Sequence, residues 1–193
     1  FLLTAALSGA MAAWIESRHV DARHSRRWIL LMWLGFALGF LAKGPPALLP
    51  LLAVATCSLC LPRGRASSAF HWSGLLVFVA VASPWFAVVI HDTPGLLDYF
   101  LGRELVQRIT SDDFGRHGEW YGWLQIYGPT LVIGSLPWTG LLWRWLRSLR
   151  ASLKNWRHVE TRAGDATGLI LFLWVLLPLL VFCLSRSRLP LYV

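Results

Sequence analysis

Charged residues are scarce in this sequence. Of its 193 residues, 15% are Asp, Glu, Lys or Arg, whereas 56% are hydrophobic and the mean hydropathy is +0.54. This balance is far too apolar for a soluble domain. The hydrophobic residues also gather in runs close to the length that crosses a bilayer, about 20 residues. The composition therefore predicts an integral membrane protein.

Cysteines are equally few, and their positions argue against a redox or metal site. Cys57 and Cys60 lie three residues apart inside one apolar run, and Cys183 lies inside another. A functional C-x-x-C would need a polar loop and further ligands. We interpret all three as residues that pack within the membrane.

The sequence has no initiator methionine and no signal peptide, and both ends fall within apolar stretches. We interpret 1–193 as a single transmembrane domain that is truncated at both ends. Six apolar segments predict an all-α, multispanning helix bundle: 1–15, 28–42, 45–61, 69–90, 120–143 and 167–184. The second and third are short for a span, so we expect them to use flanking residues. Proline is expected to kink the fourth at Pro84 and to break the fifth at Pro129 and Pro137.

The formal net charge of +8 is a topology signal and does not indicate nucleic-acid binding. Twelve of the 18 Lys and Arg residues fall in the three polar loops 16–27, 62–68 and 144–162. Alternating spans put these loops on one side, which the positive-inside rule assigns to the cytoplasm. The other, periplasmic side then receives the turn at Lys43, the long loop 91–119 and the closing segment.

Lys43 is the only lysine of the first 150 residues, and it lies between two uncharged runs. Gly44, Pro45 and Pro46 follow it and predict a tight turn, since proline suits a helix start. Burying a cation at a helix centre costs roughly 2.5–3.5 kcal/mol, so such a residue indicates a functional site. The alternative is a lysine whose ammonium reaches the lipid headgroups.

The remaining periplasmic cations lie at other segment junctions and suggest a site for an anionic group: Arg103, Arg108, Arg116, Arg186 and Arg188. Residues 101–109 have apolar residues on one helical face and polar residues on the other, which predicts a helix lying in the membrane interface. Glu104 lies four residues before Arg108, in the order that favours an ion pair. The alternative is that the two form only a weak surface ion pair. His117 is either a metal or acid–base residue or simply solvated. Asp112 and Asp113 suit helix capping better than a divalent-cation clamp.

Four motifs in order resemble the bacterial aminoarabinose lipid A transferases, within the polyprenyl-phosphate-sugar-dependent glycosyltransferases that include protein O-mannosyltransferases. These motifs are Phe40 to Pro46, Leu97 to Glu104, Asp113 to Tyr121, and Ser185 to Tyr192. The resemblance implies a multispanning inner-membrane enzyme of the C-type glycosyltransferase class with a periplasmic active site. It would transfer a sugar from an undecaprenyl-phosphate carrier to lipid A or a related glycolipid or protein acceptor.

The resemblance also implies roles for particular residues. Lys43, an arginine of the stretch from Arg103 to Arg108, and Tyr192 correspond to residues associated with the carrier phosphate. Arg188 belongs to the same closing motif. A lysine, an arginine fork and a hydroxyl donor are suitable ligands for a phosphate.

The match departs from the family in its acidic and metal-binding residues. The family's catalytic carboxylate lies upstream of this chain, so no catalytic residue is expected within it. Some members place a metal-binding histidine directly after the glutamate that Glu104 matches, whereas this chain has Leu105. No cofactor is firmly implied, and a divalent metal remains a candidate.

Two other functions compete with the transferase. A secondary transporter or flippase also uses intramembrane charges and broken helices. Transporters, however, place ionisable groups near the middle of the bilayer and often show repeats, whereas here the charges gather at one interface. A structural scaffold would tolerate replacement of Lys43 and Arg108.

Overall fold

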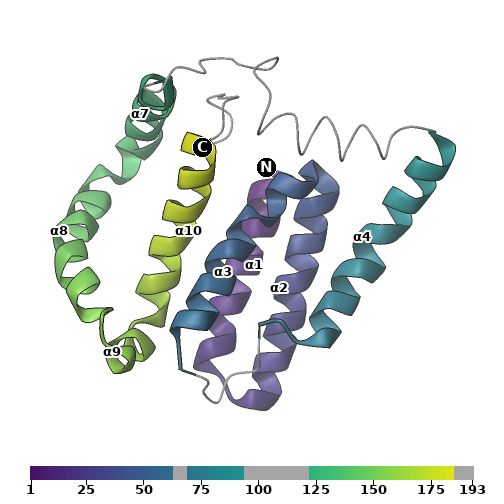
Figure 1. Ribbon diagram of the computed structural model, residues 1–193, viewed down its shortest axis with the longest axis horizontal. Coiled ribbons are helices and arrows are strands. Elements are labelled where there is room, and N and C mark those ends of the chain that lie inside the picture. Colours follow the sequence, from purple (N-terminus) through teal and green to yellow (C-terminus); the bar gives the residue numbers. More distant parts are fainter. Residues whose placement is uncertain (63–68, 94–121, 185–193) are drawn as a thin grey trace. The chain divides into compact units, whose positions relative to one another are not determined.

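The computed structural model describes residues 1–62, 69–93 and 122–184. Throughout these ranges the regular structure is helical (Figure 1). The chain divides into two compact units, one made of residues 1–94 and 158–177 and the other of residues 95–157 and 178–193. The predicted all-α class is confirmed. The two units are described in turn.

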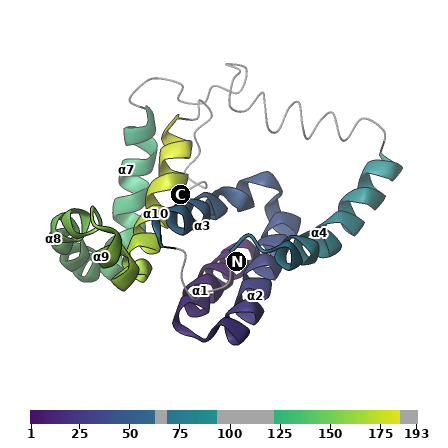
Figure 2. The same ribbon diagram turned by 60° about the horizontal axis from the view of Figure 1, so that its bottom comes forward.

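The first unit is built on a pair of closely packed antiparallel helices, α1 (Leu2–His19) and α2 (Ala22–Lys43) (Figure 2). A Cβ added to Gly35 would come within 2.8 Å of the Ala6 carbonyl oxygen and 2.9 Å of the Ala10 Cβ. The two backbones therefore meet because these residues are small. Lipid gives apolar helices no hydrophobic reason to associate, so such close packing is what holds membrane helices together.

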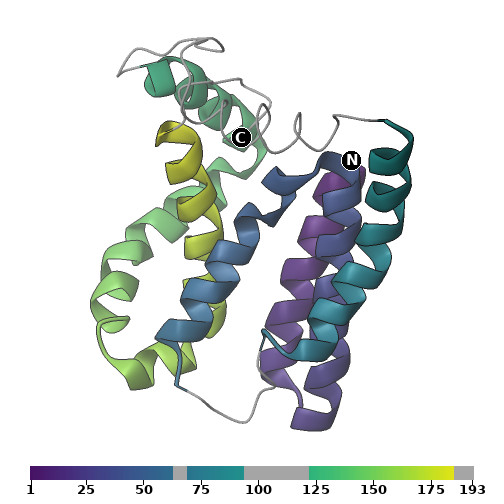
Figure 3. The ribbon, with the colours of Figure 1, turned by 45° about the vertical axis from the view of Figure 1, so that its right-hand side comes forward.

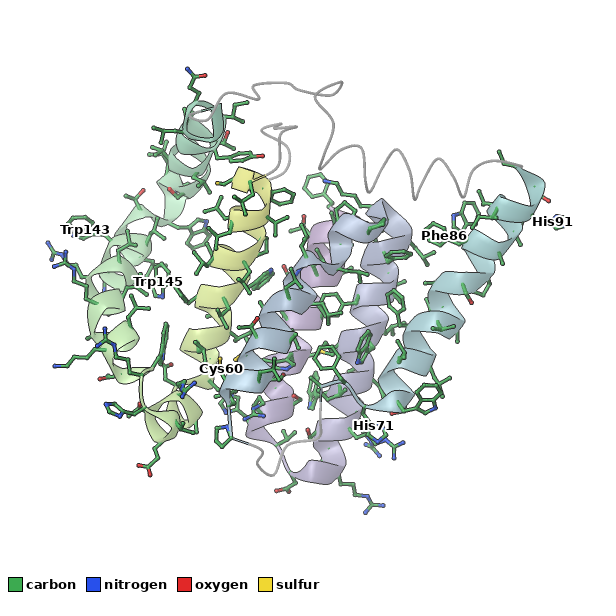
Figure 4. The ribbon with its side chains drawn as sticks, in the orientation of Figure 1. Cys60, His71, Phe86, His91, Trp143 and Trp145 are labelled. Carbon is green, nitrogen blue, oxygen red and sulfur yellow. The ribbon has the colours of Figure 1, made fainter. Side chains whose placement is uncertain are left out.

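An aromatic cluster joins α2 to α4 (Trp72–Asp92). The Trp33 indole N–H donates to the carbonyl of Ala69, just before α4 begins, at 2.8 Å. This buried donor therefore has a partner. The Trp33 ring also meets Phe70 and Phe78 edge-on, with centroids 6.0 and 5.9 Å apart. Towards the other end of the pair, Phe40 meets Phe86 at 5.1 Å (Figure 4). These contacts run along the length of the two helices.

The rest of the first unit continues from the end of α2. Pro45–Leu48 form the 3-10 turn η1, which leads directly into α3 (Leu49–Cys60). After the second unit's helices, α9 (Val159–Gly164) precedes α10 (Ala166–Leu184). The Asp165 carboxylate accepts the Gly168 N–H at 3.1 Å and so caps the start of α10.

The second unit contains α7 (Gly122–Ser135), the 3-10 turn η4 (Leu136–Trp138) and α8 (Thr139–Asn155), which follow one another without a gap. Pro137 lies in the turn and breaks the helix as predicted. The break expected at Pro129 is wrong, because α7 continues through it. Next to Pro129, the Thr130 hydroxyl donates to the Ile126 carbonyl at 2.6 Å, which is how hydroxyl side chains satisfy backbone groups near a proline.

Within the part of the chain that the structure describes, three helices are long and apolar enough to cross a membrane: residues 23–43 within α2, α4, and α10 (Figure 3). Residues 45–60, which comprise η1 and α3, form a shorter apolar stretch. The expectation that the second segment uses flanking residues is confirmed, since α2 begins six residues before Trp28. The chain is therefore a multi-pass membrane protein.

Two predicted loops are wrong. Residues 16–27 are almost entirely helical, because α1 continues to His19 and α2 starts at Ala22. Most of 144–162 is also helical, in α8 and α9. Arginine, lysine and leucine are good helix formers, so a charged stretch between apolar runs continues the helix as readily as it ends it.

Gly74 tests the packing of α4 on α2. A Cβ at this position would overlap the Trp33 indole ring. We expect Gly74→Ala to destabilise the protein by about 1–3 kcal/mol, the usual cost of overpacking. Gly134→Ala is the matched control, since a Cβ there meets nothing within 4 Å. Thermal unfolding of the full-length protein in detergent measures both. Equal midpoints for the two variants would contradict the close contact.

Candidate functional site

Lys43 is the last residue of α2, and its side chain is exposed within the structure described. Gly44 ends the helix with φ 73° and ψ −149°, and its N–H donates to the Phe40 carbonyl at 2.7 Å. This region of backbone conformation is essentially limited to glycine. Pro45 then starts the next helical turn. The turn predicted around Lys43 is therefore confirmed.

The position at the end of a helix gives the Lys43 ammonium a favourable local field. The last carbonyl groups of a helix carry partial negative charge, so a cation there is stabilised by roughly 0.3–1 kcal/mol. Placement at a helix end rather than a helix centre also avoids the cost of burying a charge in hydrocarbon. The sequence thus places a cation where apolar helix gives way to a polar boundary.

Contacts within the first unit show which of its ends lie together. At the end opposite Lys43, the His19 ring lies 3.3 Å from the Thr167 hydroxyl, which joins the end of α1 to the start of α10. Because α2 and α4 run in the same direction, with Trp33 against Phe78 and Phe40 against Phe86, α4 finishes at the same end of the unit as Lys43 (Figure 1). The last described residue after α4, Thr93, therefore lies at the end of the unit that carries Lys43.

This arrangement supports the alternation expected from the apolar runs. The arginines Arg18, Arg23, Arg26 and Arg27 lie around the short α1–α2 connection, at the end away from Lys43. Among the residues that the structure describes, the unit thus has one end rich in arginine, while Lys43 and the end of α4 lie at the other. This is the separation of charge that the sequence predicts.

An additional ionisable pair lies at the end of α4, and the sequence analysis did not identify it. His91 Nδ1 is 3.1 Å from an Asp92 carboxylate oxygen, and both side chains are largely exposed. Their adjacency at the end of an apolar run was the available signal. The pair shares the Lys43 end of the unit (Figure 4).

The other candidate site residues lie outside the described residues: Arg103, Glu104, Arg108, His117, Arg188 and Tyr192. Their convergence with Lys43 stays a prediction. Among the residues that the structure describes, no group of three or more His, Cys, Asp or Glu side chains could hold a metal ion. The candidate metal residue His117 is not among them.

No family model matches the chain. Curated relatives do, and they are named undecaprenyl phosphate-alpha-4-amino-4-deoxy-L-arabinose arabinosyl transferases. The enzyme of Edwardsiella ictaluri is 29% identical over 195 aligned residues, which cover 100% of this chain and 33% of the relative. The enzyme of Pseudomonas aeruginosa strain LESB58 is 36% identical over 179 aligned residues, which cover 90% of this chain and 30% of the relative.

A solved structure agrees with these relatives. The crystal structure of ArnT from Cupriavidus metallidurans bound to undecaprenyl phosphate superposes with a TM-score of 0.78 and 25% identity. The match covers 98% of this chain and 32% of that protein. The chain is similar to ArnT over nearly its whole length. Its resemblance to the aminoarabinose transferases is confirmed, and it spans about a third of the length of the curated relatives it matches.

Gly44 tests how the chain positions Lys43. We expect Gly44→Ala to destabilise the protein by about 1–3 kcal/mol, because its φ of 73° and ψ of −149° strain any residue with a Cβ. Gly9→Ala is the control, since Gly9 lies within α1 with nothing within 4 Å of an added Cβ. Unfolding curves of the full-length protein in detergent measure the stability of both variants. A Gly44→Ala variant as stable as Gly9→Ala would rule out the strained turn.

Proposed function

We propose that the full-length protein containing this chain is a membrane glycosyltransferase that uses an undecaprenyl-phosphate-linked sugar as donor. The acceptor is lipid A or a related periplasmic glycolipid or protein. The reaction takes place at the periplasmic face of the bacterial inner membrane. The likeness to ArnT along nearly the whole chain is the observation that carries this proposal.

The position of Lys43 is consistent with such a reaction. A polyprenyl carrier keeps its chain in the hydrocarbon and its phosphate at the membrane surface. Lys43 ends an apolar helix and its side chain is exposed, which suits a position at that depth. An ammonium also forms short, charge-assisted hydrogen bonds to phosphate oxygens.

The chemistry requires a nucleophile on the acceptor and a stabilised leaving group. The acceptor oxygen attacks the anomeric carbon of the sugar, and the bond from that carbon to the phosphate oxygen breaks. The acceptor proton passes to a carboxylate, which the family resemblance places outside this chain. The bonding electrons leave with the lipid phosphate, which departs as an anion and therefore needs no acid catalyst.

Cationic residues of this chain would stabilise the departing phosphate. In the proposal, Lys43, Arg108 and Tyr192 donate to its oxygens, and Arg103 and Arg188 contribute positive charge nearby. Glu104 would orient Arg108 through their spacing of four residues. The relatives are named as transferases, which favours this function over a transporter.

Replacing Lys43 tests the proposed function directly. We expect Lys43→Ala to lower the rate of sugar transfer from undecaprenyl-phosphate sugar at least about tenfold, because loss of a donor to developing charge commonly costs 100-fold or more. Lys43→Arg should retain part of the activity, since it keeps the positive charge. The assay uses the full-length protein in membranes.

Arg26→Ala is the matched control, because Arg26 is an exposed cation near the other end of α2. Its transfer rate should equal that of the unmodified protein. Full activity in Lys43→Ala would exclude the proposed role of the lysine. Loss in both variants would indicate a general effect of charge on folding or insertion.

A further inference from the structure

Helix α8 carries two distinct faces that the transfer reaction does not use. Four cations recur at spacings of three or four residues and so share one side of the helix: Arg144, Arg147, Arg150 and Lys154. A row of leucines recurs at the same spacings on another side: Leu142, Leu146, Leu149 and Leu153. This is the pattern of a helix that lies at a membrane surface.

No negative charge accompanies the cations. The sequence contains no Asp or Glu between Glu119 and Glu160, so α8 and the segments flanking it are purely basic. All four cationic side chains are exposed in the structure. A partner for this face must therefore be anionic and must come from outside α8.

The leucine row is also largely uncovered. Leu142, Leu146 and Leu153 are 39%, 45% and 43% exposed, respectively. A helix that projected straight into water would leave this row solvated. If α8 instead lies along the interface, the leucines contact acyl chains while the cations reach the headgroups.

The cations of α8 follow an apolar stretch that is about as long as a membrane span. About 20 residues cross the hydrocarbon of a bilayer. A stretch of that length that begins at Gly122, the start of α7, ends near Leu142. The first cation, Arg144, follows directly. In an arrangement where this stretch crosses the membrane, the cationic part of α8 lies along the headgroup layer.

Two tryptophans flank the first cation of α8. Trp143 and Trp145 lie on opposite sides of α8 (Figure 4). The Arg147 guanidinium stacks over the Trp143 ring, 4.8 Å from its centroid. Tryptophan is enriched at the membrane interface, and a cation–π contact fixes the arginine beside the ring. The pair therefore holds one member of the basic face at headgroup level.

We propose that the basic face of α8 binds the phosphates of anionic phospholipids in the leaflet where this segment leaves the membrane. The leucine row rests against the acyl chains of the same lipids. The ligand is a structural phospholipid such as phosphatidylglycerol, and none of the residues proposed to bind the carrier phosphate belongs to this face. The proposal depends on the chain being a membrane protein and not on its transfer activity.

The test measures lipid selectivity of the full-length protein. The protein is reconstituted in phosphatidylcholine bilayers that contain either spin-labelled phosphatidylglycerol or spin-labelled phosphatidylcholine. Electron paramagnetic resonance gives the fraction of each label immobilised on the protein and hence the ratio of their association constants. No enzymatic activity is needed, so failure here is distinguishable from failure of the proposed function.

The decisive variant is the triple substitution Arg144→Gln, Arg147→Gln and Arg150→Gln. Each cation near an anionic surface adds about fivefold to lipid affinity at one site, and averaging over all boundary lipids dilutes this preference. We therefore expect the ratio to fall at least roughly twofold. The matching triple substitution to lysine should retain it, since it keeps the charge.

A second triple variant, Arg23→Gln, Arg26→Gln and Arg27→Gln, removes the same charge from the start of α2. Its ratio should stay near that of the unmodified protein. If the glutamine triple on α8 does not fold, the pair Arg150→Gln and Lys154→Gln in the outer half of the helix takes its place, with a smaller fall expected.

Two results would overturn the proposal. One is an unchanged ratio in the α8 glutamine variants. The other is an equal fall in the α2 variant, which would show that total charge and not the face of α8 selects the lipid.

Discussion

The structure depends on one property of its solvent: hydrocarbon provides no partner for a hydrogen bond or a charge. Backbone groups inside the membrane must therefore satisfy each other, which is why the described elements are helices. Polar groups that remain need a specific local solution. Trp33 donates to the Ala69 carbonyl, and Thr130 donates to Ile126 beside Pro129. Lys43 lies at the end of α2, so its charge is not placed at the centre of a membrane helix.

The same solvent explains how the first unit is held together. Apolar side chains gain little by leaving lipid for protein, so helix contacts rely on close approach and shape. Small residues bring α1 against α2, and interlocking aromatic rings hold α4 against α2. These contacts run towards Gly44 through Phe40 and Phe86. The helix that ends at Lys43 is therefore supported on two sides.

Hydrophobic runs predicted the membrane helices well, because their length and composition reflect bilayer thickness directly. Residues 69–90 and 167–184 became α4 and α10 with shifts of a few residues. The junction at Lys43 was also predictable, since the Gly–Pro–Pro sequence has few conformations available. Polar stretches were harder. Residues 16–27 and 144–162 look like loops by hydropathy, yet the arginines of both stretches and the leucines of the second favour helix.

The candidate site was predictable only in part. Local sequence placed Lys43 at a helix end, and the family resemblance associated an arginine of the stretch from Arg103 to Arg108, and Tyr192, with the same carrier phosphate. Whether distant junctions meet depends on how the helices are arranged, which no periodicity encodes. The His91–Asp92 pair and the two faces of α8 became clear only from the structure. Both features depend on a helix that continues beyond its apolar run.

The central claim is that the Lys43 turn lies at the periplasmic membrane surface and contacts the carrier phosphate. Labelling of Ala42→Cys tests it most directly, in full-length protein whose Cys57, Cys60 and Cys183 are replaced by alanine. Ala42 is exposed next to Lys43, and Asp21→Cys at the other end of α2 is the control.

A membrane-impermeant maleimide is applied to spheroplasts and to inverted vesicles. The account predicts that Ala42→Cys reacts in spheroplasts, that undecaprenyl phosphate slows this reaction, and that Asp21→Cys reacts only in inverted vesicles. Reaction of Ala42→Cys only from the cytoplasmic side, or a rate unaffected by undecaprenyl phosphate, would contradict it.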